Sequence, residues 1–384
     1  MINKTRLIKL LTRLIAIKSE NPPGDEFEIA RFVRRYLLGF GVASRIYEFK
    51  KRRSNVVAMM GVKADRRGEG ASLLITPHLD TVPAGKGWHT DPFKALLKNG
   101  KVYGLGATDC KGNLAVALEV MQSLTEDKAA LDYALIFAAT ANEESGSDFG
   151  LVTLLNKGIL DCDAAVVLDA DAFEIVVTQK GLLHVKLKVE GKRSHGAYPW
   201  LGVNAVDITL KILDELKAQR PEFRRNPYLR PPTINIGTIR GGDKVNVVAD
   251  WCECELDFRF LPGSKAEDLL RMIRKICLRR AKRFSIETEG IQKPYAIDVR
   301  HPLIAGLKAA ARSVGARSQL TGSEGATVIT FFHDKKIPAV ATGYGAEGRA
   351  HCVDEFAAVE SLYRGARVLE RFLRSWNTAG RSAR

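Results

Sequence analysis

Hydrophobic positions along the first half of the chain follow two alternating patterns. Short, continuously apolar runs of strand-forming residues occupy 71–76, 133–140 and 164–169, whereas 25–42 and 112–124 repeat apolar residues at helical spacing. Strands that alternate with helices predict an α/β domain built around a mostly parallel sheet. The continuous apolar character of the strands agrees with burial on both faces of that sheet.

The pattern changes near Lys180. Residues 182–191 alternate strictly between apolar and polar positions, which is typical of a strand with one face exposed to solvent. A helix over 204–219, a hairpin-like pair of strands, a helix over 265–284 and a last strand follow. This β-α-β-β-α-β order indicates an inserted ferredoxin-like, α+β domain.

The α/β pattern then returns, with helical spacing over 301–315 and a final helix over 359–376. We therefore expect one α/β domain formed by 1–179 and 294–384, interrupted by an inserted domain over 180–293. The length of 384 residues agrees with two or three domains.

Composition limits the class of protein. The chain is 46% hydrophobic and 27% charged, as expected of a soluble globular protein. Its first helical segment, 2–19, is interrupted by Lys4, Arg6, Lys9 and Arg13 and has neither a signal-peptide core nor a membrane span. Six cysteines without a CxxC pair argue against a disulfide framework. We expect a cytoplasmic protein with no membrane association.

The formal net charge of +15 is high. Nucleic acid, an acidic protein or anionic substrates could each explain it. No aromatic-rich RNA motif, helix-turn-helix or zinc finger accompanies the charge. We interpret it as a basic surface that attracts small anions, and we do not expect nucleic acid as a partner.

Side chains of the kinds that bind metal ions follow several predicted strands. They are His78, Asp80, Asp109, Glu143, Glu144, Asp169 and His351. Each has an ordinary structural explanation when taken alone, such as a helix N-cap for Asp109 or a solvated loop for His351. Open α/β sheets, however, bind ligands where strands end. Imidazoles and carboxylates gathered there would suit a pair of zinc ions.

Five motifs in this order resemble the dinuclear zinc hydrolase family that contains acetylornithine deacetylase, succinyl-diaminopimelate desuccinylase, aminoacylases and glutamate carboxypeptidase. The motifs are HLDTVP, GATDCKGN, NEESGS, the VVLDADA to TQKG junction, and AHCVDE. The resemblance extends from about Leu14 to Leu373. It implies a catalytic α/β domain interrupted by a ferredoxin-like lid or dimerisation domain.

The resemblance also implies roles for the metal-binding side chains. His78 and Asp169 would bind one divalent ion, most readily zinc, with cobalt or manganese as alternatives. Glu144 and His351 would bind the second ion, and Asp109 would bridge the two.

Two carboxylates would act beside the metals. Glu143 resembles the family's general base, which takes a proton from water. Asp80 would accept a hydrogen bond from His78 and orient its ring. The family also has a cis peptide after the bridging aspartate, here between Asp109 and Cys110.

Three lid residues complete the expected site. His195 would reach the active site of the partner subunit in a homodimer, and Asn246 and Arg259 would hold the carboxylate of the substrate. For Arg259, an ordinary surface position on a strand is the alternative explanation.

The implied reaction is hydrolysis of an amide. The motifs SENPPGDE, HGAYPWLGVNAV and AHCVDE favour removal of an acetyl or succinyl group from a small, anionic N-acyl amino acid. Aspartate at Asp169, where deacylases commonly have glutamate, favours an exopeptidase acting on dipeptides. A non-catalytic binding protein would have lost a ligand or the base, and all of these residues are present.

Overall fold

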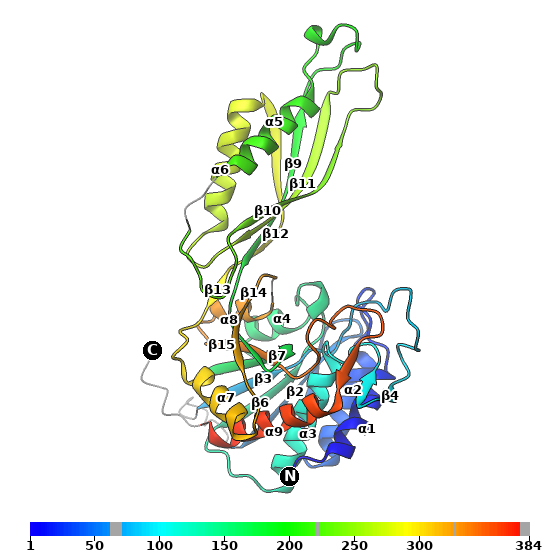
Figure 1. Cartoon of the computed structure of the whole chain (residues 1–384), viewed down its shortest axis with the longest axis vertical. Coiled ribbons are helices and arrows are strands. Elements are labelled where there is room, and N and C mark those ends of the chain that lie inside the picture. Colours follow the sequence, from blue (N-terminus) through cyan, green and yellow to red (C-terminus); the bar gives the residue numbers. More distant parts are fainter. Residues whose placement is uncertain (62–70, 220–222, 326, 377–384) are drawn as a thin grey trace. The chain divides into compact units, whose positions relative to one another are not determined.

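The computed structural model describes residues 1–61, 71–219, 223–325 and 327–376 (Figure 1). The chain forms two compact units. The first comprises Met1–Val177, Ile297–Thr321 and Phe331–Arg384, and the second comprises Thr178–Ala296 and Gly322–Thr330. The second unit thus includes Gly322–Thr330 in addition to the inserted segment expected from the sequence.

The main sheet is mixed, with a parallel centre. Its strand order is β1-β2-β6-β3-β7-β15-β8-β13, and β14 pairs with β8. The strands are β1 (Ser44–Lys50), β2 (Arg53–Gly61), β3 (Ser72–Thr76), β6 (Ala134–Ala139), β7 (Ala164–Ala172), β8 (Glu174–Gln179), β13 (Tyr295–Ala296), β14 (Gln319–Ser323) and β15 (Ala339–Gly343). The neighbouring strands β6, β3, β7 and β15 are parallel, and antiparallel strands flank them on both sides.

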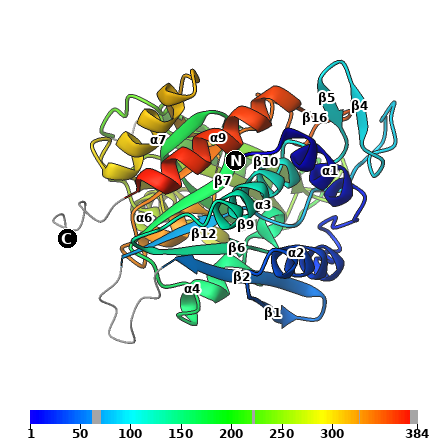
Figure 2. The same cartoon turned by 90° about the horizontal axis from the view of Figure 1, so that it is seen from below.

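Helices cover this sheet. They are α1 (Lys4–Ile15), α2 (Phe27–Gly39), α3 (Lys111–Glu126), α4 (Leu151–Asn156), α7 (Pro302–Ser313), α8 (Ile329–His333) and α9 (Val359–Ser375), with a short 3₁₀ turn η1 (Glu143–Ser145). Contacts join α1 to α3, α3 to α9 and α9 to α7, and Figure 2 shows these helices side by side. Every residue of β3, β6 and β15 is buried, which for β3 and β6 confirms the expectation from their continuous apolar sequences.

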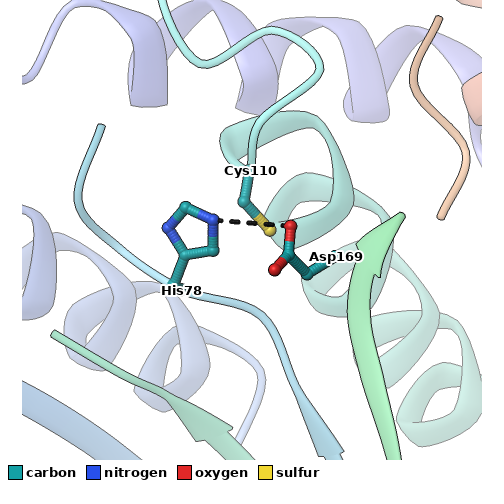
Figure 3. Close-up of side chains that lie close together, drawn as sticks. All are labelled: His78, Cys110 and Asp169. Atoms are coloured by element: carbon teal, nitrogen blue, oxygen red, sulfur yellow. Dashed lines mark ion pairs between the residues drawn. The ribbon is translucent and has the colours of Figure 1, made fainter. Parts of the chain in front are cut away.

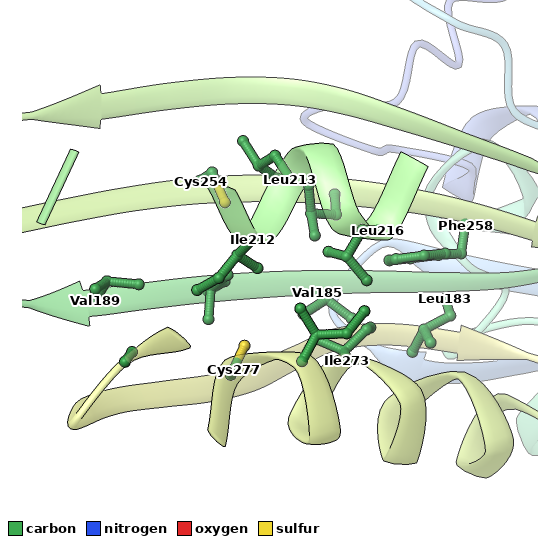
Figure 4. Close-up of a cluster of buried hydrophobic side chains, with 14 of the residues drawn as sticks. Leu183, Val185, Val189, Ile212, Leu213, Leu216, Cys254, Phe258, Ile273 and Cys277 are labelled. Carbon is green, nitrogen blue, oxygen red and sulfur yellow. The ribbon is translucent and has the colours of Figure 1, made fainter. Parts of the chain in front are cut away.

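The second unit contains the predicted β-α-β-β-α-β order. Its antiparallel sheet has the order β10-β11-β9-β12. Its elements are β9 (Gly181–Glu190), η2 (Pro199–Leu201), α5 (Ala205–Ala218), β10 (Thr233–Gly241), β11 (Trp251–Phe260), α6 (Ala266–Arg280) and β12 (Arg283–Gln292). Alternate residues of β9 and β11 are buried against α5 and α6, and Figure 4 shows part of this core. The α/β class with an inserted antiparallel domain is therefore confirmed.

Smaller features complete the fold. A three-stranded ribbon has the order β16-β5-β4, with β4 (Leu96–Lys98), β5 (Lys101–Tyr103) and β16 (Phe356–Ala358). All six cysteines are free, as their spacing predicted. Within the described ranges, no helix is both long and apolar enough to cross a lipid bilayer.

Candidate metal centre

Four neighbouring parallel strands bring the predicted metal-binding residues of the first unit to one edge of the sheet. His78 follows β3, Glu143 and Glu144 follow β6, Asp169 lies near the end of β7, and His351 follows β15. Because the carboxyl ends of adjacent parallel strands point the same way, residues from distant parts of the sequence meet there.

Asp109 lies between the two imidazoles. Its Oδ1 is 2.9 Å from His78 Nε2, and its Oδ2 is 3.1 Å from His351 Nε2. His78 Nε2 is also 3.8 Å from Asp169 Oδ1, and His351 Nε2 is 3.1 Å from Glu144 Oε2. Each oxygen of Asp109 therefore faces one histidine, and each histidine faces one further carboxylate, as a bridged pair of metal ions would require.

The pairing of β7 with β15 shifts at the position of Asp169. Thr342 pairs with Leu168 but the next residue, Gly343, pairs with Ala172, so three residues of β7 bulge out of the ladder. A Cβ atom on Gly343 would lie 1.7 Å from the carbonyl oxygen of Ala170, so the bulge depends on glycine there. Figure 3 shows the resulting direction of the Asp169 carboxylate, towards His78 and beside Cys110.

The hydrogen bonds of His78 define its tautomer. Nδ1 lies 3.0 Å from the main-chain oxygen of Asp80, and a carbonyl oxygen can only accept, so Nδ1 carries a proton and Nε2, which faces Asp109, is the ring nitrogen that would bind a metal ion. The Asp80 carboxylate is farther from Nδ1, at 3.6 Å. It accepts instead from the main-chain N–H groups of Glu143 and Glu144, both at 3.1 Å. Asp80 therefore orients His78 mainly through its carbonyl group, rather than through the side chain that the sequence suggested.

Glu355 contributes to the site although the sequence analysis did not single it out. Its buried carboxylate accepts from the main-chain N–H groups of Gly106, Thr108 and Asp109 at 2.7, 2.7 and 2.9 Å. These bonds join the segment that carries Asp109 to the segment that carries His351. The only signal in the sequence is the last residue of the AHCVDE motif.

The peptide bond between Asp109 and Cys110 is cis, which confirms the expectation from the family resemblance.

Electrostatics favour a cation at this edge of the sheet. Burial raises the pKa of Glu143 well above its usual value, and the charge of Asp169 adds to the effect. Burial likewise raises the pKa of Glu144 and of Asp169. Hydrogen bonds to Asp109 and Glu144 raise the pKa of His351 to about 11. Because these donors are oxygen and imidazole nitrogen, and because their carboxylates repel one another, the site fits divalent metal ions.

The second unit places the three predicted lid residues in two separate groups. The main-chain N–H of Gly196, next to His195, donates to the main-chain oxygen of Asn246 at 2.8 Å, and His195 pairs with Val247 in an isolated bridge. Arg259 lies near the other end of β11. Its guanidinium donates to both oxygens of Asp257, at 2.8 and 3.1 Å.

Residues 74–375 match the family described as Peptidase family M20/M25/M40. The chain belongs to this family. Acetylornithine deacetylase of Pasteurella multocida strain Pm70 is 30% identical to the chain over 340 residues, covering 85% of this chain and 84% of that protein. The resemblance inferred from the five motifs is therefore confirmed, and the protein is a metallohydrolase of the M20/M25/M40 family.

Solved structures agree with this assignment. A tripeptidase of Staphylococcus aureus subsp. aureus Mu50 superimposes with a TM-score of 0.81 at 25% identity, covering 97% of this chain and 98% of that chain. Aminopeptidase PepT of Bacillus cereus ATCC 10987 has the same TM-score at 23% identity, with the same coverage, and so has the same fold.

The contacts of Glu355 lead to a prediction. In Glu355→Gln, one carboxylate oxygen becomes an amide NH₂ that faces main-chain N–H donors, so the Asp109 segment loses part of its anchor. We expect the affinity for divalent metal to fall about 10–100-fold, as is typical when residues behind metal ligands are changed. Titration of the metal-free protein with zinc against a chromophoric chelator measures this affinity.

Asp163→Asn is the matched control for this experiment. Asp163 also accepts from a main-chain N–H, that of Ser72 at 2.8 Å, but at the opposite end of β3. This variant should keep the metal affinity of the wild type. Equal affinities in Glu355→Gln and the wild type would show that the three hydrogen bonds do not position Asp109.

Proposed function

We propose that the protein is a dinuclear metal-dependent deacylase that removes an acetyl or succinyl group from a small N-acyl amino acid. The observation that carries the proposal is the position of Asp109, with one carboxylate oxygen facing each histidine. The 30% identity to acetylornithine deacetylase of Pasteurella multocida supports the choice of substrate class.

We assign His78 and Asp169 to one metal ion, Glu144 and His351 to the other, and Asp109 to both. Zinc suits these donors best, and cobalt or manganese would also accept them. When bound, the ions polarise the scissile carbonyl and lower the pKa of a water molecule towards neutrality.

Glu143 is the proton carrier in this proposal. It is adjacent to Glu144 in the chain, and burial together with the charge of Asp169 raises the pKa of its carboxyl group. A carboxylate of raised basicity accepts a proton from the attacking water more readily. The same group then delivers that proton to the leaving amine as the amide bond breaks.

An exopeptidase of the same mechanism is the second candidate. Two observations favour it: residue 169 is aspartate, and the Staphylococcus aureus structure that superimposes on this chain is called a tripeptidase. The two candidates differ in the group that occupies the acyl side of the scissile bond. Both need a cationic side chain that binds the substrate carboxylate. Arg259 supplies that side chain if its guanidinium leaves or shares Asp257.

The proposal includes a homodimer, for a geometric reason within the second unit. Arg259 lies eight residues beyond Trp251 along β11, which corresponds to roughly 26 Å of extended strand. His195 and Asn246 lie in the loops beyond the Trp251 end. A small N-acyl amino acid cannot contact both groups in one chain, so a second copy would supply one of them.

Exposed apolar side chains support an interface at the same end. They are Tyr198, Trp200, Leu201 and Val245. Such clusters commonly mark contact surfaces between proteins, where aromatic residues are enriched.

The substrate experiment incubates the metal-loaded protein with N-acetyl and N-succinyl amino acids, dipeptides and tripeptides, and identifies the products by mass. We expect metal-dependent release of acetate or succinate. Cleavage of peptides alone would favour the exopeptidase, and no turnover of any amide with two ions bound would contradict both candidates.

Two adjacent glutamates allow a matched test of the general base. Glu143→Gln should retain both metal ions and lose about 10²–10⁴-fold in kcat, because only the proton carrier is removed. Glu144→Gln should instead lose metal, because a ligand is weakened. Metal content measured by plasma mass spectrometry, together with initial rates, separates the two results. Full activity in Glu143→Gln would exclude it as the base.

The dimer is tested by mixing two inactive variants. A His195→Ala subunit cannot supply His195 to the active site of its partner, and a Glu143→Gln subunit lacks the base in its own active site. After subunit exchange, heterodimers hold one intact site, so we expect roughly a quarter of wild-type activity in the mixture. Activity that stays at the level of the separate variants would mean that His195 does not act across subunits.

A further inference from the structure

The segment Ser19–Glu26, which contains the SENPPGDE motif, has no role in the chemistry described so far. It runs beside the residues that follow β3. Ser19 Oγ donates to the main-chain oxygen of Leu79 at 2.8 Å. Thr81 N donates to Ser19 O at 3.0 Å, and Asn21 N donates to Thr81 O at 2.7 Å. The segment is therefore attached to the strand end that carries His78 and Asp80.

Side chains from this segment close a ring of buried polar contacts, here called the polar ring. Its members are Asn21, Glu26, Arg53, Asp80 and Asn142. Asn21 Nδ2 donates to Asp80 Oδ2 at 2.8 Å, and Arg53 Nη1 donates to Asn21 Oδ1 at 3.5 Å. Arg53 Nη2 and the main-chain N–H of Asn142 both donate to Glu26 Oε1, at 2.7 and 3.2 Å. Asp80 closes the ring by accepting from the two residues after Asn142.

The members of the polar ring come from four segments that the fold brings together. All five are buried, with 5% or less of their surface exposed. Charged groups in such an environment interact strongly, because little water screens them. A substitution of Asn21 or Glu26 therefore removes a hydrogen-bond partner of Asp80 or Asn142 directly.

The polar ring is not explained by stability alone. Among the described residues, none donates to Glu26 Oε2 or accepts from Arg53 Nε, although both atoms are buried. A buried network with unsatisfied members stabilises a fold less than apolar packing of the same volume would. The presence of these residues is better explained by a need to hold neighbouring residues in position.

Asn142 is the member of the polar ring whose backbone conformation matters most for the metal centre. Its backbone is left-handed, with φ 66° and ψ 24°, a conformation that few L-residues other than asparagine and aspartate adopt. It immediately precedes Glu143 and Glu144, so its conformation determines where both carboxylates point. Glu26 holds the N–H on one side of this residue, and Asp80 holds the two N–H groups on the other.

We propose that Asn21, Glu26 and Arg53 are positioning residues that fix Asp80 and the turn carrying Glu143 and Glu144. None of the three reaches the metal donors, and they act through the polar ring. The inference rests on the proposed function, because the residues that it positions are the proposed base and metal ligands.

The test compares Asn21→Ala and Glu26→Ala with the wild type in substrate turnover and, after cobalt substitution, in the visible absorption spectrum. We expect kcat to fall about 10–100-fold with KM within about twofold, the usual cost of changing residues behind an active site. The cobalt bands should shift, because Glu144 and His78 change orientation. Glu26→Gln keeps an oxygen acceptor for both donors and should restore most of kcat.

Glu119 offers a matched control. It is another buried glutamate that accepts from a guanidinium, Arg6 Nε at 2.6 Å, and from a main-chain N–H, that of Asn3 at 2.6 Å. It lies on α3 more than two turns from Asp109. Glu119→Ala should lower the melting temperature as Glu26→Ala does, but leave kcat and the cobalt spectrum unchanged.

Two results would overturn the inference. One is wild-type kcat and an unchanged cobalt spectrum in folded Asn21→Ala, which removes no charge and so keeps the test valid if Glu26→Ala does not fold. The other is an equal loss of kcat in Glu119→Ala, which would indicate a general effect of destabilisation. If the wild type hydrolyses no amide, the proposed function fails, and the cobalt spectra alone then decide the inference.

Discussion

Repulsion among the partly buried carboxylates of Asp109, Glu143, Glu144 and Asp169 is the unfavourable interaction that the fold of the first unit has to offset. Burial and the neighbouring charges raise the pKa of Glu143, Glu144 and Asp169, so the protein without metal holds these groups at an electrostatic cost. Glu143, Glu144 and Asp169 stay together because they are attached to strand ends whose main-chain pairing and apolar burial do not depend on charge, and Asp109 lies in the loop before α3. Divalent cations then offset the repulsion, which couples metal binding to the stability of the site.

The same kind of interaction positions the candidate metal-binding side chains in two loops. Asp80 accepts the main-chain N–H groups of Glu143 and Glu144, and Glu355 accepts those of Gly106, Thr108 and Asp109. In both cases a buried carboxylate fixes the backbone of a loop rather than its side chains. A loop held in this way has few alternative conformations, and a metal site requires that precision from its supporting residues.

The second unit divides its predicted functional residues between two ends of one sheet. His195 and Asn246 lie beyond one end of β11, whereas Arg259 lies near the other and pairs with Asp257. The ferredoxin-like arrangement thus separates these residues by the length of its strands. Under the proposed homodimer, two copies of the chain would supply these residues to one substrate.

The sequence by itself determined the element types, the α/β class with its inserted domain, and the candidate residues for the chemistry. Periodicity reports which faces are buried, so the strands of the parallel centre and the alternating strand after Lys180 could be predicted. The motifs also placed His78, Asp109 and His351 at strand ends or loops, where ligands bind.

Only the tertiary structure decided how these residues are held. Glu355 lies 246 residues from the Asp109 N–H that it accepts, and Asn21 lies 59 residues from Asp80. No local pattern encodes such pairs, because a hydrogen bond between distant segments depends on how the elements pack. The bulge at Asp169 and the use of the Asp80 carbonyl group by His78 were hidden for the same reason, since both depend on main-chain geometry, which side-chain identity does not specify.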